Sequence, residues 1–246
     1  MKEKKAVFIY SQQLGKYSYP PDCPFNLSRT PRLHKILNSM GLLSGNNISQ
    51  IAPHKPGREV LEMFHTSRYL DALQNAAKGK FDIEALHMGI GSPDCPVFGD
   101  MYKCSVLAAG ATLAGAEAIL KNEADIAFNP SGGFHHASPE HAAGFCYIND
   151  VALACLVLAN ASKKVLYLDI DVHHGDGVQN LFYNRKDVMT ISFHQNGRTL
   201  FPGTGFEDEI GIGKGQGYCV NVPLPIDTYD EAYFKAYKQI VPPLMK

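Results

Sequence analysis

Five of the ten histidines lie between positions 135 and 174, together with glycines and carboxylates. His135 and His136 form a tandem pair shortly after a pair of glycines. Imidazole titrates near neutral pH, so such a pair suits general acid–base catalysis, and the glycines let the backbone approach a ligand closely. Each ring needs a partner that fixes its tautomer, and Asp169 and Asp176 are the natural candidates. We therefore expect an acid–base site on this loop.

Carboxylate and imidazole alternate at Asp169, Asp171 and His173, where an apolar run ends. Alternate residues of an extended chain point to one side, and these two side-chain types are ligands of zinc and of iron. Cα atoms of successive residues on one face of a strand are about 6.6 Å apart. Three such residues in a row are therefore poorly placed to bind one ion together. We expect Asp171 and His173 to bind the metal, with Asp169 orienting a neighbouring group.

Each of these motifs also has a simpler interpretation. One Asp-x-Asp can be a solvated turn, and one histidine is more often structural. Two histidine pairs, together with three carboxylates inside the eight residues 169–176, favour a site, because buried charges without partners are costly. Phe145, which follows Gly144, and Phe201 could line a slot for a thin alkyl chain. On the residues alone, ordinary core packing is favoured for both rings.

The elements that must hold these residues alternate between strand and helix. Apolar runs rich in β-branched and aromatic residues predict strands, and the run at 163–171 reads as buried on both faces. This order predicts an α/β fold with a largely parallel β-sheet and helices on both faces, with sites at the carboxyl edge of the strands. The expected strands are 6–10, 124–129, 163–171, 188–194 and 218–222, and the expected helices are 26–40, 67–77, 100–121, 149–160, 178–183 and one opened by a capping box at Thr228 and Glu231.

Composition limits the classes of function. The 246 residues carry 23 Lys+Arg and 24 Asp+Glu without a basic stripe, which argues against a nucleic-acid binder. No apolar run approaches the roughly 18–20 residues of a membrane helix, and the first apolar run is too short for a secretion signal. The six cysteines form no CxxC pair, which fits reduced thiols in the cytoplasm. The oligomeric state stays open.

Three stretches of this sequence resemble the zinc-dependent histone deacetylase family: SGGFHHASPEHAAGFCYIND, DIDVHHGDGVQNLF and FPGTG. The resemblance is greatest to the acetoin-utilisation type of bacterial and archaeal deacetylases, which are similar to class I enzymes. It implies the arginase/deacetylase fold. It also implies hydrolysis of N-acetyl-lysine to lysine and acetate, with an acetylated protein or peptide as substrate.

The resemblance implies roles for the charged residues. His135 is similar to the first tandem histidine, paired with Asp169, and His136 to the general base and acid, paired with Asp176. Asp171 and His173 match two ligands of a Zn²⁺ ion, for which Fe²⁺ is the alternative. Structural K⁺ sites are implied as well, partly through backbone carbonyls, one around Asp169, Asp171, His173, Ser192 and Phe193 and one around Phe182, Arg185, Val188 and Tyr218.

Substrate contacts are implied in the same way. Phe145 and Phe201 resemble the walls of the acetyl-lysine tunnel, and Gly144 lies at its narrow part. Asp94 resembles the aspartate at the rim that grips the substrate backbone. Arg29 resembles an internal arginine near the cavity through which acetate leaves.

Two functional residues of the family have no match in this chain. One is a second metal-ligating aspartate and the other is a tyrosine that hydrogen-bonds the developing oxyanion. We expect both to lie beyond residue 246, so that residues 1–246 form a single domain, incomplete at its C-terminus and without the last strands. Missing strands would leave an exposed sheet edge and apolar helix faces. The chain alone is then expected to bind metal weakly and to deacetylate poorly or not at all.

Three other functions are compatible with parts of this pattern. An acetylpolyamine deacetylase would favour small cationic substrates, and the PDCP and FCYIND contexts speak mildly against it. An arginase-type ureohydrolase would need more carboxylates for its pair of manganese ions. A non-catalytic protein that binds acetyl-lysine would keep the phenylalanines and lack metal-dependent turnover.

Overall fold

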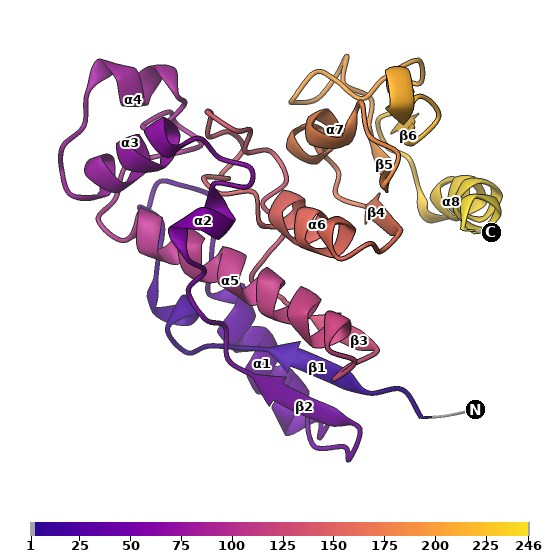
Figure 1. Cartoon of the computed structure of the whole chain (residues 1–246), viewed down its shortest axis with the longest axis horizontal. Helices are drawn as coiled ribbons and strands as arrows, with labels where there is room; N and C mark the ends of the chain where they lie inside the picture. The colour runs from indigo at the N-terminus through magenta and orange to yellow at the C-terminus, as the bar shows by residue number, and fades with distance from the viewer. Residues whose placement is uncertain (1–2, 246) are drawn as a thin grey trace. The chain divides into compact units, whose positions relative to one another are not determined.

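The computed structural model describes residues 3–245, and their contacts divide the chain into two compact units, Met1–Ser162 and Lys163–Lys246. Each unit has its own three-stranded parallel sheet with helices (Figure 1). The α/β class with parallel strands is thus confirmed. That all 246 residues form a single domain stays a prediction.

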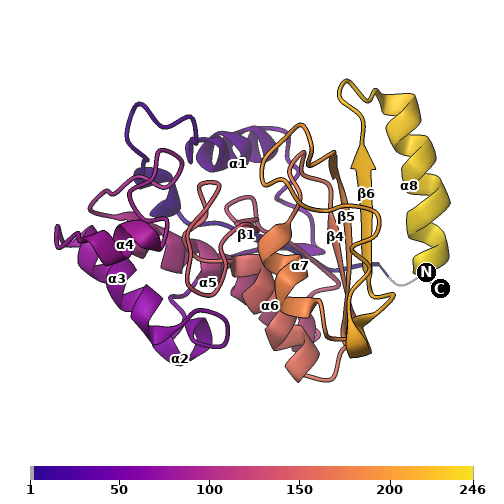
Figure 2. The same cartoon turned by 90° about the horizontal axis from the view of Figure 1, so that it is seen from above.

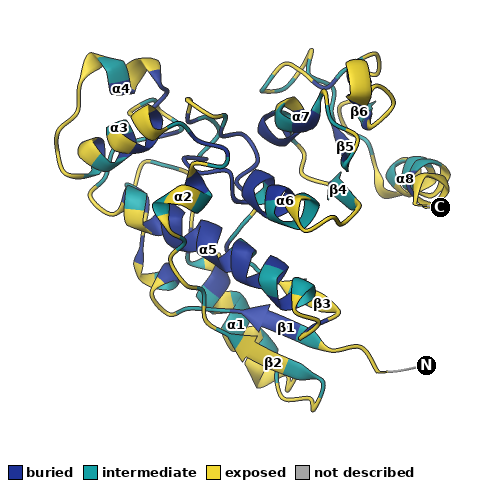
Figure 3. Cartoon of the chain, in the orientation of Figure 1, coloured by how far each residue is buried: buried dark blue, intermediate teal, exposed yellow. Residues whose placement is uncertain are grey.

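The sheet of the first unit is built around β1 (Ala6–Ile9). This strand pairs in parallel with β2 (Ile48–Ile51) on one side and β3 (Ile126–Phe128) on the other. β1 is buried over its last three residues, as its apolar sequence predicts. β2 was not among the expected strands, because two of its four residues, ISQI, are polar, and these two are exposed (Figure 3).

Among the described residues, the first unit holds six α-helices and the short 3₁₀ helix Leu14–Lys16, and α5 is the longest. Its sequence is rich in Ala and Gly, and these small side chains let it pack against β1, β3 and α6. A Cβ on Gly110 of α5 would lie 1.8 Å from the carbonyl oxygen of His54, so this glycine is required for the close approach. The helices are α1 (Arg29–Ser39), α2 (Arg58–Leu61), α3 (Ser67–Ala77), α4 (Ile83–His87), α5 (Met101–Leu120) and α6 (Asp150–Asn160).

α5 alone among the helices of residues 3–245 has the length and hydropathy that a membrane span needs. The expectation that no apolar run approaches this length was therefore wrong for α5. Of its apolar window, 72% is buried inside the protein, which the packing of a core helix accounts for (Figure 3). One buried helix of this kind is weak evidence for a membrane span.

The second unit holds strands β4 (Val165–Asp169), β5 (Val188–Gln195) and β6 (Cys219–Leu224), in that order. α7 (Asp176–Phe182) follows β4, and α8 (Asp230–Leu244) follows β6. α8 runs alongside the sheet in Figure 2. Val241 of this helix joins Ile191 and Phe193 in a small core.

Two local predictions were wrong in this unit. β4 is not buried on both faces, because its first four residues are only half-buried. The capping box does not form either. The Thr228 hydroxyl donates to the carbonyl of Pro225 at 2.7 Å, and α8 begins at Asp230 without a side-chain cap.

Candidate active site

The tandem histidines lie in the loop that joins β3 to α6, within the first unit. His135 is 7% exposed and His136 is 5% exposed, and their ring centroids are 4.1 Å apart. Imidazoles buried side by side are polar groups that the protein must hold in defined positions. The acid–base role that the sequence predicts for the pair stays a prediction.

Gly144 lies against the ring of His136. A Cβ at this position would be 2.4 Å from Cδ2 of His136, closer than real Cβ contacts allow. The φ angle of Gly144 is +53° and that of Phe145 is +67°. Positive φ at a phenylalanine is unusual and is retained only where the surroundings enforce it. The structure therefore brings Gly144, Phe145 and His136 together, as the sequence predicts for neighbouring parts of one site.

Asp94 holds the Gly144 turn through a hydrogen bond to its backbone. Its Oδ2 accepts the backbone N–H of Gly144 at 2.6 Å, and its Oδ1 accepts the hydroxyl of Ser92 at 2.9 Å. The sequence predicts that Asp94 grips a substrate backbone, and this remains a prediction. What the structure adds is that Asp94 fixes the turn carrying Phe145.

Phe145 is held by two residues that the sequence analysis missed. The Tyr19 hydroxyl donates to the carbonyl of Phe145 at 2.8 Å, and the Phe25 ring stacks on the Phe145 ring with centroids 5.6 Å apart. Burial raises the pKa of Tyr19 far above its usual range, so the hydroxyl stays a donor. These contacts join residues more than a hundred positions apart, and no local signal in the sequence reveals them.

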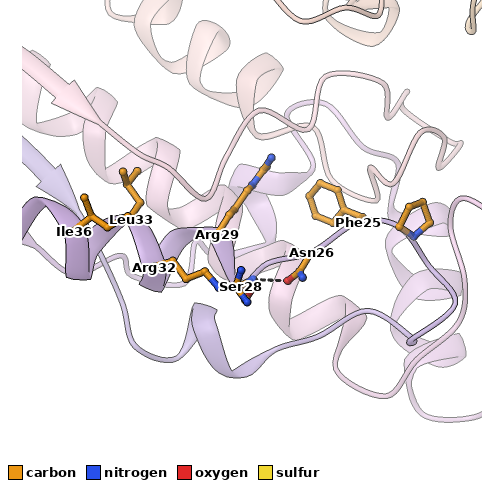
Figure 4. A pocket seen from close by; sticks show the side chains of 8 residues that line it. Phe25, Asn26, Ser28, Arg29, Arg32, Leu33 and Ile36 are labelled. Carbon is orange, nitrogen blue, oxygen red and sulfur yellow. Dashed lines mark hydrogen bonds between the residues drawn. The ribbon is translucent and has the colours of Figure 1, made fainter.

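Arg29 lies behind this aromatic pair. Its guanidinium carbon is 5.1 Å from the centroid of the Phe25 ring, within the range of a cation–π contact. Figure 4 shows Arg29 and Phe25 on the rim of a hollow beside α1, where Asn26 Oδ1 accepts the N–H of Ser28 at 2.8 Å. The structure thus connects Arg29 to Phe145 through one ring, and its role in acetate release stays a prediction.

The carboxylate and imidazole motif lies in the second unit, just after β4. The extended geometry expected from the alternation was wrong, because the strand ends at Asp169 and the chain then bends. Asp169 Oδ1 accepts the N–H of Asp171 at 3.0 Å, and Asp171 Oδ1 accepts the N–H of His173 at 2.8 Å. Each carboxylate therefore bonds the backbone two residues ahead, which is the pattern of Asx turns.

Asp171 and His173 still come into contact. Nδ1 of His173 and Oδ1 of Asp171 are 3.0 Å apart, and both side chains are partly exposed. The Phe201 ring has its centroid 6.2 Å from that of His173. The Tyr167 hydroxyl, which the sequence analysis missed, donates to Asp169 Oδ2. Its position two residues before Asp169 on the strand was an available signal.

Donor chemistry gives a test of the implied metal. One carboxylate and one imidazole in contact fit two positions of a zinc or iron site. Within residues 3–245, no group of three or more His, Cys, Asp or Glu side chains could hold a metal ion. The two donors fit the metal in type and do not complete a site. The predicted K⁺ sites, which rely partly on backbone carbonyls, stay predictions.

A buried polar network supports the loop that carries Phe201. His174 contacts the Thr204 hydroxyl through Nδ1 at 2.8 Å and Gln179 Oε1 through Nε2 at 2.9 Å. Gln179 donates to Glu209, whose other oxygen accepts the N–H groups of residues 205 and 206. Burial lowers the pKa of His174 below its ordinary value.

Asp176 is the first residue of α7, and its N–H donates to the carbonyl of His174 at 2.9 Å. The sequence predicts that His135 pairs with Asp169 and that His136 pairs with Asp176. Both pairings join residues of different units, and both remain predictions.

Comparison with known proteins identifies the relatives of this chain. Residues 23–246 match the model of the histone deacetylase domain. The chain is 38% identical to histone deacetylase clr6 of Schizosaccharomyces pombe, covering 99% of this chain and 60% of that protein. It is 39% identical to the acetoin utilization protein AcuC of Bacillus subtilis, covering 96% of this chain and 61% of that protein.

A solved structure agrees with these matches. The crystal structure of an HDAC homolog from Aquifex aeolicus superimposes with a TM-score of 0.87 at 36% identity, covering 96% of this chain and 66% of that one. The chain therefore spans about 60% of the length of the curated relatives named above.

Proposed function

Because this chain belongs to the histone deacetylase family, we propose that the protein carrying it hydrolyses N-acetyl-lysine in proteins or peptides with the help of a metal ion. The observation that carries the proposal is the buried pair His135 and His136, with Gly144 pressed against the second ring. A buried, tightly packed imidazole beside a backbone of unusual conformation is typical of a catalytic site.

His136 is the general base and acid of this proposal. Its ring takes a proton from the attacking water and later gives a proton to the departing lysine amine. The contact with Gly144 leaves the His136 ring little room to move. The ring therefore already has its position before the substrate binds. A bound zinc or iron ion, held in part by Asp171 and His173, would lower the pKa of water and polarise the amide carbonyl.

Phe145 and Phe201 are proposed to flank the alkyl stem of acetyl-lysine, with Gly144 at the narrow part. Asp94 is proposed to accept N–H groups of a peptide backbone. Each of its oxygens accepts a hydrogen bond from within the protein, and a carboxylate oxygen can accept two. This acceptor favours an acetylated protein or peptide over a free polyamine.

The number of metal ligands bears on the activity of the chain. A catalytic zinc site has three protein ligands in most cases, and residues 3–245 supply two that touch. We therefore propose that the 246-residue chain alone binds metal weakly and turns over slowly. We also place the protein in the cytoplasm, because its six cysteines are free thiols.

A substitution at His136 tests the proposed reaction. In the protein purified from its source, His136→Asn should lower kcat for an acetyl-lysine peptide by about 10²–10⁴-fold, the usual contribution of a general acid–base group. The matched control is His87→Asn, at the exposed end of α4. Acetate release would be measured for both variants. Acetyl-peptide binding without acetate release in the unmodified protein would favour the binding function instead.

A further inference from the structure

Two consecutive residues at the start of α6, Asn149 and Asp150, are both fully buried polar residues. We propose that they are positioning residues, which fix the backbone on both sides of the tandem histidines. The link to catalysis rests on the proposed function, while the positioning itself rests on the contacts described below.

The Asn149 side chain forms hydrogen bonds through both its amide oxygen and its amide nitrogen. Its Oδ1 accepts the N–H of Ala152 at 2.9 Å, which makes Asn149 the side-chain N-cap of this helix. Its Nδ2 donates to the carbonyl of His135 at 3.1 Å and to the carbonyl of Ala137 at 2.9 Å. These carbonyls flank His136, so one amide group holds the main chain before and after the proposed base.

Asp150 holds the segment that leads into the histidines. Its carboxylate accepts the N–H of Phe134 at 2.7 Å and that of Gly133 at 3.0 Å, and it also accepts the Thr112 hydroxyl. Burial raises the pKa of Asp150, and these hydrogen bonds oppose that effect. A Cβ on Gly132 would lie 2.3 Å from Oδ2, so the glycine keeps the space that the carboxylate occupies.

Helix capping alone does not explain this choice of residue. Serine, threonine or aspartate would cap the helix as well as asparagine does. Only a group with two N–H donors can bond both carbonyls and keep the cap. The specific use of the carboxamide is therefore to hold the loop, and a loop that shifts by about 1 Å can cost on the order of 10²-fold in rate.

Two substitutions separate the cap from the positioning bonds. Asn149→Ser keeps a capping oxygen and is too short to reach the two carbonyls. Asn149→Asp keeps the cap and the shape, and it turns an oxygen toward the carbonyls in place of the donor. The matched controls are Asn160→Ser and Asn160→Asp, the same changes at the exposed last residue of the same helix.

The first readout is the imidazole NMR spectrum of the histidine-labelled protein, which needs no turnover. We expect the His135 and His136 signals to shift or broaden in both Asn149 variants and to stay unchanged in both Asn160 variants. The second readout is kinetic. We expect kcat to fall at least about tenfold with KM changed by less than about threefold, because positioning acts on the reacting groups.

Unchanged histidine signals together with unchanged kcat in Asn149→Ser would overturn the proposal, whatever happens to the melting temperature. If Asn149→Asp does not fold, Asn149→Ser decides alone, since it keeps the cap and adds no charge. If the unmodified protein releases no acetate, the proposed function fails, and the imidazole spectra still decide whether Asn149 positions the histidines.

Discussion

At the scale of single residues, the site depends on a glycine whose missing side chain makes room for an imidazole. Gly144 combines a positive φ with a contact to His136 that leaves no space for a Cβ. Asp94 then holds the N–H of the same residue. The positions of the Gly144 turn, the Asp94 carboxylate and the His136 ring therefore depend on one another. A side chain added at Gly144 should displace His136, the proposed base.

Gly144→Ala should lower kcat/KM for an acetyl-lysine peptide by about 10²-fold, because the new methyl displaces His136 from its position. The control is Gly79→Ala. Gly79 has a φ of +83° and a Cβ added there would meet nothing within 4 Å, so it bears the same backbone strain without the contact. Both variants should lose about 1–2 kcal/mol of stability from the left-handed backbone. Full activity in Gly144→Ala would contradict this account of the glycine.

Contacts between residues close together in the sequence could be predicted better than contacts between distant residues. A cap of α6 by Asn149 or Asp150 follows from a rule about neighbouring residues, and in the structure Asn149 is the cap. The bond from Tyr19 to Phe145 joins residues 126 positions apart, and only the folded chain brings them together. Asp171 and His173 were expected on one face of an extended strand, and the structure instead shows a bend in which the two side chains touch.

At the scale of elements, the start of α6 is supported by a buried histidine. His65 lies between α2 and α3, and its Nε2 accepts the backbone N–H of Asn149 at 3.0 Å. Burial lowers its pKa from 6.5 to about 4, although the carbonyls of Pro139 and Ser138 oppose this. The ring is therefore neutral in the folded protein at neutral pH.

This histidine should make stability depend on pH. Between pH 6.5 and about 4 the unfolded chain binds a proton at His65 and the folded chain does not, so stability falls as the pH falls. The shift corresponds to roughly 3 kcal/mol lost across that window. In His65→Gln, which keeps an acceptor for Asn149, urea midpoints should fall less between pH 7 and pH 4.5 than in the unmodified protein. Equal losses in both proteins would refute the assignment, and exposed His87→Gln serves as the control.

The β3 edge is the other feature of this scale. β3 pairs only with β1 in the sheet of its unit, and its Ile126 and Phe128 are each 48% exposed. An apolar edge strand is a template for pairing with another chain. The sheet of the first unit therefore offers β3 as a strand through which the 246-residue chain can aggregate. The edge expected from missing C-terminal strands is a different one, and it stays a prediction.

Ile126→Lys should slow the aggregation of the 246-residue chain several-fold, because a charge on an edge strand disfavours pairing with a second copy. Light scattering at fixed concentration would follow it. The control is Ile83→Lys on α4, where an isoleucine that is 69% exposed lies outside any strand. Equal slowing by both substitutions would show that added charge and not the β3 edge controls aggregation.

At the scale of the whole molecule, the order of strands and helices predicted the α/β class, because periodicity and runs of apolar residues are properties of the sequence itself. The separation into two units, each with three parallel strands, was not predicted. Pairing between strands depends on contacts far apart in the chain. The short and polar β2 was missed for the same reason, since only its neighbour β1 makes it a strand.

The chemistry also divides between the units. The histidine pair and the Gly144 turn belong to Met1–Ser162, while Asp171 and His173 belong to Lys163–Lys246. The proposed reaction needs an acid–base group and a metal-bound water. The histidine pair would supply the acid–base group, and Asp171 and His173 would supply metal ligands. Family membership supports the deacetylase proposal for a protein that carries both.

The most direct measurement is acetate release from an acetyl-lysine peptide by the protein purified from its source, before and after removal of metal by a chelator. We expect acetate release to be lost with the metal and to return when Zn²⁺ or Fe²⁺ is added back, with one acetate formed for each lysine side chain deacetylated. Release that survives complete removal of metal, or no release from the metal-loaded protein, would contradict the proposed function.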